Sequence, residues 1–263
     1  MRRFCVWTEP LQLNCAPLHV SYVTSKTSRH YPLIRHASNR SKSSSKYLAR
    51  QRHDEFVRLK KADGSGYVSR SAYKLQQLSK KYPFLQPGRA IVDLGAAPGG
   101  WSQAVVQQCP DSKVYALDLL PLQISEPNVV FLRGDFMNQQ VRSDLASLVT
   151  RKVDVVLSDM MANTSGNAVR DAQASLDLCM AAFDFCLSML QESSTLYKNP
   201  GDARVLPSFV CKYFMSPEAD EFRKVLKQHF QYVRSEKMKA SRTESREQYW
   251  VCILSLIHIS EPT

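Results

Sequence analysis

Short apolar runs alternate with longer amphipathic segments along the chain from about residue 52. The apolar runs have the length and the Val, Ile and Leu content of buried strands, and they cover residues 90–94, 113–120, 129–135, 152–159 and 209–214. Helical periodicity covers residues 69–81, 101–109, 169–190 and 217–229, and two closing strands are expected near 230–236 and 248–254. This alternation predicts an α/β fold, a mostly parallel seven-stranded sheet with helices on both faces. The final strand-to-strand step predicts an antiparallel partner at one edge.

The turn after residues 90–94 is rich in glycine, although the chain has only nine glycines. The sequence DLGAAPGGW (93–101) joins a strand to a helix, and such a unit directs backbone N–H groups at a ligand. The turn lacks the GxGxxG spacing of dinucleotide-binding folds, and its proline removes an N–H donor that a pyrophosphate would use. We therefore expect a nucleoside cofactor without a pyrophosphate, namely S-adenosylmethionine. Its candidate contacts here are Gly95, Pro98, Gly99, Gly100 and Trp101.

Aspartates end three successive apolar runs: Asp118, Asp135 and Asp159. Because the carboxyl ends of parallel strands meet at the edge where open α/β sheets bind ligands, these side chains are candidate cofactor contacts. Asp118 follows Gly95 by about twenty residues, the position from which an acid accepts hydrogen bonds from ribose hydroxyls. Asp135 is assigned to the adenine amino group and Asp159 to the amino acid moiety. Taken singly, each aspartate has loop capping as its alternative role.

Several motifs together resemble the FtsJ-type ribosomal RNA 2′-O-methyltransferases. They are SRSAYKL (69–75), VDLGAAPGGWSQ (92–103), LDLLP (117–121), GDF (134–136), LSDM (157–160), SG (165–166), FVCK (209–212) and SREQY (245–249). The resemblance runs from about residue 52 to 254 and implies a methyltransferase domain at 51–254 with a Rossmann-like, S-adenosylmethionine-dependent fold. It also implies a uridine of large-subunit ribosomal RNA as the target. NPGDARVLPS (199–208), DMMAN (159–163) and the tail at 255–263 depart from the family pattern.

The family's Lys-Asp-Lys-Glu catalytic tetrad falls by motif on Lys74, Asp159, Lys212 and Glu247. A ribose 2′-hydroxyl is a poor nucleophile, so the enzyme must align it with the methyl group and assist removal of its proton. A lysine accepts a proton only if its pKa falls, and burial and a second nearby cation both lower it. Lys212 is therefore assigned as the principal base or orienting group and Lys74 as its partner. Asp159 and Glu247 are assigned as electrostatic orienters.

Residues 1–50 differ in composition from the rest of the chain. They contain nine basic residues, eleven Ser or Thr and a single acid, and they carry eight of the eleven net positive charges. Such a composition predicts a mitochondrial transit peptide, and hence a matrix location, with a disordered RNA-binding arm as the alternative. In the remainder, basic segments at 51–81 and 223–246 flank an acidic centre at 82–222. We expect these segments to form an RNA-binding rim.

The seven cysteines are dispersed and contain no CxxC pair, which argues against a disulfide framework and a zinc site and fits a reducing compartment. No apolar run reaches the length of a membrane span. We accordingly expect no metal, no membrane span and a monomer.

The favoured function is 2′-O-methylation of mitochondrial large-subunit ribosomal RNA in support of ribosome assembly, with the large-subunit precursor as partner. One alternative is methylation of transfer RNA or another RNA in the cytosol or nucleolus. Another is a non-catalytic ribosome-assembly factor that retains the fold. A Rossmann dehydrogenase is the most remote alternative.

Overall fold

The computed structural model describes residues 66–190, 206–241 and 245–253. The predicted leader at 1–50, the tail at 255–263 and most of the departure at 199–208 lie outside these residues. The strands are β1 (Ala90–Leu94), β2 (Lys113–Asp118), β3 (Val129–Arg133), β4 (Val155–Ser158), β5 (Ser208–Phe214), β6 (Tyr232–Glu236) and β7 (Glu247–Ile253). The helices are α3 (Ser71–Lys81), α4 (Gly100–Gln108), α5 (Gln139–Leu148), α6 (Ala168–Met189) and α7 (Pro217–His229).

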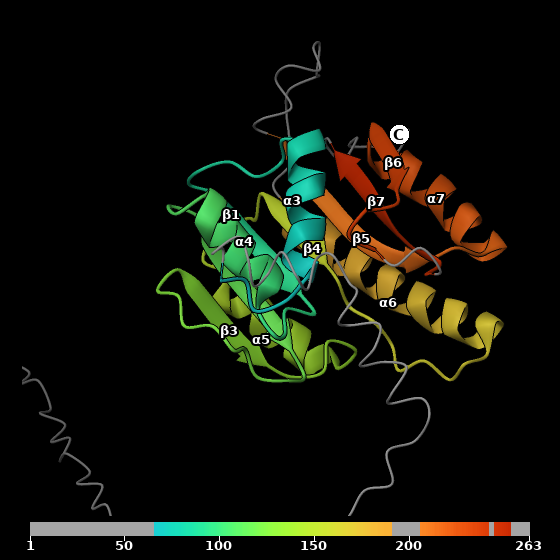
Figure 1. Ribbon diagram of the computed structural model, residues 1–263, viewed down its shortest axis with the longest axis horizontal. Coiled ribbons are helices and arrows are strands. Elements are labelled where there is room, and N and C mark those ends of the chain that lie inside the picture. Colours follow the sequence, from blue (N-terminus) through green and yellow to red (C-terminus); the bar gives the residue numbers. More distant parts are fainter. Residues whose placement is uncertain (1–65, 191–205, 242–244, 254–263) are drawn as a thin grey trace, which may run out of the picture.

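The strands form one seven-stranded sheet in the order β3-β2-β1-β4-β5-β7-β6 (Figure 1). The first five are parallel, whereas β7 runs antiparallel to both of its neighbours, β5 and β6. The predicted α/β class and the seven-stranded, mostly parallel sheet are therefore confirmed. The predicted antiparallel pairing is also present, but β7 lies inside the sheet and β6 forms the edge.

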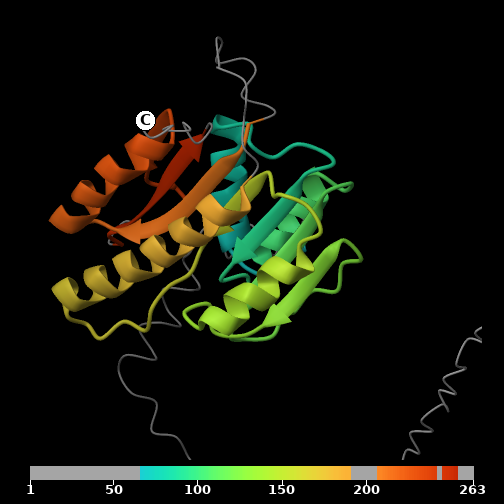
Figure 2. The same ribbon diagram turned by 180° about the vertical axis from the view of Figure 1, so that it is seen from behind.

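Helices cover both faces of the sheet. Figure 1 shows α3 and α4 on one face, and Figure 2 shows α5, α6 and α7 on the other. Each helical layer packs against its own hydrophobic cluster, and the side chains of the strands alternate between the two clusters. Because both faces are covered, β1 is buried at all five positions, which explains why its sequence AIVDL is apolar except for Asp93.

Helix α5 is absent from the sequence prediction, which was wrong for this segment. In its sequence, QQVRSDLASL, only Leu145 is fully buried, while Val141 and Ala146 are partly buried against the core, so its apolar stripe is short and weak. The helix starts with a side-chain cap, since the Asn138 side chain accepts a hydrogen bond from the backbone N–H of Gln140 (2.8 Å).

Candidate active site at the carboxyl edge of the sheet

The glycine-rich turn brings β1 close to the loop that follows β4. Gly95 has φ +77°, a conformation that favours glycine, and its N–H donates to the carbonyl of Leu117 (2.9 Å). A Cβ atom on Gly95 would lie 2.8 Å from the backbone of Met160. Any larger residue here would push these two segments apart, so the close approach itself requires glycine.

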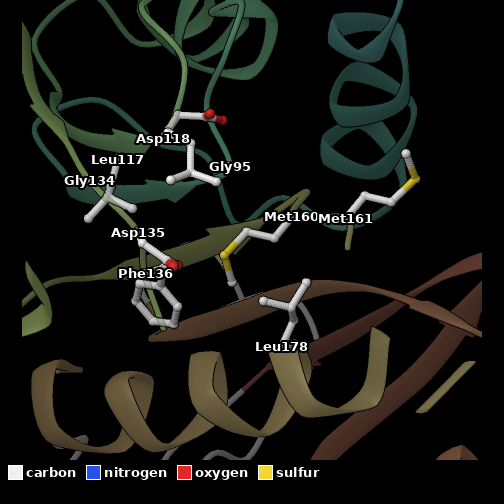
Figure 3. Close-up of a pocket in the computed structure, with 10 residues that line it drawn as sticks. Gly95, Leu117, Asp118, Gly134, Asp135, Phe136, Met160, Met161 and Leu178 are labelled. Carbon is white, nitrogen blue, oxygen red and sulfur yellow. The ribbon is translucent and has the colours of Figure 1, made fainter. Parts of the chain in front are cut away.

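A pocket of about 420 Å³ lies beside this turn, at the carboxyl ends of β1 to β4. Its lining residues are Gly95, Leu117, Asp118, Leu119, Gly134, Asp135, Phe136, Met160, Met161 and Leu178. Figure 3 shows Asp118 and Gly95 on one side and Phe136 and Leu178 on the other. Apolar walls with a few polar groups are typical of small-molecule sites, and the position at the carboxyl edge agrees with the sequence-based expectation.

Two of the predicted cofactor-binding aspartates, Asp118 and Asp135, line this pocket. The Asp118 carboxylate accepts hydrogen bonds from the backbone N–H groups of Ala97 (2.9 Å) and Leu120 (2.8 Å), one on each oxygen. Asp135 accepts from the N–H of Met137 (2.9 Å). Because a carboxylate has about four acceptor positions, both side chains keep the capacity to bind hydroxyl or amino groups of a ligand.

The other residues predicted in the turn lie around the pocket rather than in its lining. Gly100 packs so closely on the start of α3 and the residues before it that an added Cβ would meet the Ser69 hydroxyl at 2.0 Å and the Ser71 hydroxyl at 2.8 Å. The Trp101 side chain is buried, and its indole N–H donates to the Ser71 carbonyl (2.9 Å). Trp101 therefore offers a ligand only its backbone N–H, one of the four that the first turn of a helix leaves without an intrahelical acceptor.

The structure brings all four residues of the predicted tetrad together. Lys74 comes from the buried face of α3, and its ammonium lies 2.6 Å from Oε1 of Glu247 at the start of β7. Asp159 follows β4, and its Oδ1 lies 3.2 Å from the ammonium of Lys212 in β5. The Lys212 ammonium also donates to the backbone carbonyl of Asp159 (2.6 Å).

These charges are largely withdrawn from water, since Lys74, Lys212 and Glu247 are each less than 10% exposed. Two cations and two carboxylates give the cluster formal neutrality, and this pairing makes its burial tolerable. Burial on its own raises the pKa of Asp159. The Lys212 and Lys74 ammonium groups and a hydrogen bond from Tyr249 outweigh that effect and hold the pKa below its ordinary value, so Asp159 is a carboxylate at neutral pH.

Sequence reasoning missed the role of Tyr249 in this cluster. Its hydroxyl accepts a hydrogen bond from the Lys74 ammonium (3.1 Å) and donates one to Oδ1 of Asp159 (2.8 Å). The signal was present in the SREQY motif, but a tyrosine within the strand sequence EQYWVCI is typical of a core position.

Asp93 is a second residue that sequence reasoning left without a role. It is fully buried in β1, where its Oδ2 accepts a hydrogen bond from the Ser102 hydroxyl (2.6 Å). Its Oδ1 has no hydrogen-bond partner in the described part of the chain. Burial raises its pKa to about 7, the charges of Asp159 and Asp118 act in the same direction, and the Ser102 hydrogen bonds oppose them. Asp93 therefore changes protonation near neutral pH.

The expected absence of a metal site and of a membrane span concerns residues 66–190, 206–241 and 245–253, the described part of the chain. No group of three or more His, Cys, Asp or Glu side chains in these ranges has the arrangement of a metal site. Within the same ranges, no helix combines the length and the apolar content that crossing a bilayer requires.

Known proteins similar to this chain are ribosomal RNA methyltransferases. Ribosomal RNA large subunit methyltransferase E of Acinetobacter baumannii (strain ATCC 17978) is 39% identical over 214 residues, 80% of this chain and 91% of that protein. The protein of the same name from Legionella pneumophila (strain Paris) is 38% identical over 213 residues, 80% of this chain and 96% of that protein. A crystal structure of a ribosomal RNA methyltransferase from Plasmodium falciparum matches with a TM-score of 0.61 and 27% identity, covering 72% of this chain and 99% of that one.

The family comparison agrees with these relatives. Residues 67–254 match the FtsJ-like methyltransferase family, a range that contains the glycine-rich turn, the pocket and all four tetrad positions. Methyltransferases of this family depend in general on S-adenosylmethionine. The chain belongs to the FtsJ-like methyltransferase family.

Proposed function

We propose that this protein transfers a methyl group from S-adenosylmethionine to a ribose 2′-hydroxyl, with a uridine of mitochondrial large-subunit ribosomal RNA as the target. The observation that carries the proposal is the buried Lys74–Glu247 and Lys212–Asp159 cluster at the carboxyl edge of the sheet. This cluster directly adjoins the pocket, because Met160, the neighbour of Asp159 in the chain, lines it.

The pocket combines hydrogen-bond acceptors and apolar side chains that suit an adenosine moiety. Asp118 would accept hydrogen bonds from the ribose hydroxyls and Asp135 from the adenine amino group, while Phe136 and Leu178 would contact the base. When bound, S-adenosylmethionine supplies a methyl group that the positive sulfonium already activates. The protein must therefore provide alignment and removal of the hydroxyl proton rather than further activation of the methyl group.

The lysines are positioned to bind the substrate hydroxyl. Each ammonium has three N–H groups, and each has two acceptors among the described residues: Glu247 and Tyr249 for Lys74, and two oxygens of Asp159 for Lys212. One N–H of each ammonium thus remains to donate to a ligand, and a lysine that has released this proton would offer a lone pair in the same direction to accept the hydroxyl proton. We assign Lys212 as the principal base or orienting group for the 2′-oxygen and Lys74 as its partner. Asp159 and Glu247 hold the two ammonium groups in place.

The described parts of the two basic segments, residues 66–81 on one side and 223–241 and 245–246 on the other, contact each other beside the tetrad. The Arg70 guanidinium donates to the carbonyl of Ala240, and the side-chain oxygen of Gln77 accepts a hydrogen bond from the backbone N–H of Ala240 (3.3 Å). Lys81 and Glu236 form an ion pair (2.7 Å). Residues more than 150 positions apart in the sequence thus form one surface next to Lys74, which supports an RNA-binding rim. Phosphate contacts from such a rim add affinity with little sequence specificity.

The mitochondrial location and the uridine target rest on sequence composition and on family resemblance. Residues 1–50 have the composition of a transit peptide. The names of the bacterial relatives support large-subunit ribosomal RNA as the substrate class.

Methyl transfer from labelled S-adenosylmethionine tests the proposal when large ribosomal subunits, their free RNA and transfer RNA are compared as acceptors. We expect label in large-subunit RNA, and we expect Lys212→Ala to abolish it while cofactor binding persists. Equal labelling by Lys212→Ala and the wild type would refute catalysis by this cluster. Label confined to transfer RNA would favour the alternative substrate.

A reporter fusion tests the location. Residues 1–50 fused to a fluorescent protein should direct it into the mitochondrial matrix, and the same segment with its nine basic residues replaced by glutamine should not. A cytosolic signal from the unmodified fusion would refute the proposed location.

A further inference from the structure

Tyr249 lies where the two halves of the tetrad meet. It is fully buried in β7, and it pairs directly across the sheet with Lys212 of β5. Since side chains alternate along a strand, both residues face the helical layer that carries Lys74. The Tyr249 hydroxyl is therefore directed into the charge cluster and not toward solvent.

The hydroxyl is the link between two otherwise separate ion pairs. In the described ranges, the ion pairs join Lys74 to Glu247 and Lys212 to Asp159, and none joins one pair to the other. The Tyr249 oxygen makes that connection, since it accepts from Lys74 (3.1 Å) and donates to Asp159 (2.8 Å). A phenol suits this position because one oxygen serves as both acceptor and donor.

The ring of Tyr249 packs against a residue next to the expected cofactor site. Its centroid lies 5.7 Å from that of Trp101, the residue that follows the glycine-rich turn. The same indole donates to the backbone of Ser71 at the start of α3, three residues before Lys74. The turn, the lysine helix and the tyrosine strand therefore meet at one buried aromatic contact.

We propose that Tyr249 is a positioning residue for methyl transfer, whose hydroxyl sets the Lys74 ammonium relative to the Asp159 carboxylate. This inference rests on the proposed function of the tetrad. Burial, followed by the nearby carboxylates of Asp159 and Glu247, raises the pKa of Tyr249 well above its ordinary value. The phenol consequently keeps its proton, and its hydrogen bond to Asp159, at neutral pH.

Tyr249→Phe tests the inference, because it removes the hydroxyl and keeps the ring against Trp101. We expect kcat to fall about 10- to 100-fold, the magnitude of a lost hydrogen bond to a charged group. The KM for S-adenosylmethionine should change less than threefold, and the pH profile of kcat should shift. Tyr213→Phe is the matched control. It removes another buried tyrosine hydroxyl from the same strand pair, one that donates to Gln248 (2.8 Å) on the opposite face of the sheet, and it should retain wild-type kcat.

The outcomes separate this inference from the proposed function. A Tyr249→Phe variant with wild-type kcat and pH profile would overturn the positioning role and leave the function intact. A wild-type protein that binds S-adenosylmethionine but methylates no RNA would overturn the function. In that case a crystal structure of Tyr249→Phe decides the positioning role: movement of the Lys74 ammonium away from Asp159 supports it, and an unchanged cluster refutes it.

Discussion

The Lys212 ammonium contacts Asp159 twice, at the backbone carbonyl (2.6 Å) and at carboxylate Oδ1 (3.2 Å). The parallel pairing of β4 and β5 makes this possible. It sets Ser158 beside Cys211, and so brings the residues that follow them, Asp159 and Lys212, close together. Two acceptors on one residue restrict the direction of the third N–H. A buried cation held in this way suits the orientation of a weak nucleophile.

Lys212→Met keeps most of the volume of the side chain and removes its charge. We expect the rate of methyl transfer to fall at least 100-fold, with cofactor affinity unchanged within about threefold. Loss of the cation should also raise the pKa of Asp159, since burial then acts with less opposition. The control is Lys152→Met, which removes an exposed lysine outside both basic segments, one that donates to the Ser188 carbonyl (2.6 Å), and it should leave the rate unchanged. A decrease of less than tenfold in Lys212→Met would contradict the assigned role.

Gly95→Ala should destabilise the glycine-rich turn by more than the left-handed backbone conformation of Gly95 alone explains. Gly88 has nearly the same φ (+75° against +77°), but nothing lies within 4 Å of an added Cβ there. Gly88→Ala should thus lower the free energy of unfolding by about 1–2 kcal/mol through the left-handed conformation alone. Gly95→Ala should lower it further and weaken S-adenosylmethionine binding, because its methyl group meets the backbone of Met160. Equal effects of the two substitutions, measured by urea unfolding and calorimetry, would refute the close-approach argument.

The protonation of Asp93 should make stability depend on pH. The folded protein retains this proton up to a pKa of about 7, whereas the unfolded chain releases it near the ordinary 3.8. Between these values the folded state binds more protons, so this group's contribution to stability is present below about pH 4 and is lost as the pH rises to 7. The full difference is about 4 kcal/mol. Asp93→Asn should remove this decline when its unfolding is compared with wild type at each pH, and an unchanged slope would contradict the buried-acid interpretation.

Asp118→Asn should weaken cofactor binding. The substitution removes the charge and turns one acceptor into a donor, so at least one of the N–H groups of Ala97 and Leu120 loses its partner. We expect the Kd for S-adenosylmethionine to rise about 10- to 100-fold by calorimetry. Asp111→Asn, which neutralises an exposed acid outside the pocket, is the control and should bind normally. Normal binding by Asp118→Asn would exclude Asp118 as a cofactor contact.

The sequence predicted the sheet well because its central strands are buried on both faces. β1 and β4 are mostly apolar, with one polar residue each, and each ends directly before a turn or loop of the site. Helix α5 escaped prediction because it is short and its apolar stripe is weak: Leu145 alone is fully buried, and Val141 and Ala146 are only partly buried against the core. The position of β7 between β5 and β6 also escaped, since strand order depends on long-range pairing that local periodicity does not report.

The four tetrad residues could be predicted from motifs, but the hydrogen bonds by which Tyr249 joins the two ion pairs could not. Lys74 and Glu247 are 173 positions apart, and their motifs identify them one by one. The bridging role of Tyr249 depends on its register opposite Lys212 and on the packing of α3 over that strand pair. A tyrosine in an apolar strand looks like a core residue until those two relationships are known.

The central claim is that this cluster methylates a ribose hydroxyl, and the identity of the methylated nucleoside tests it most directly. Large-subunit ribosomal RNA treated with the protein and labelled S-adenosylmethionine is digested to nucleosides and separated. The account predicts label in 2′-O-methyluridine, and its absence with Lys212→Ala. Label in a base-methylated nucleoside, or undiminished label with Lys212→Ala, would contradict it.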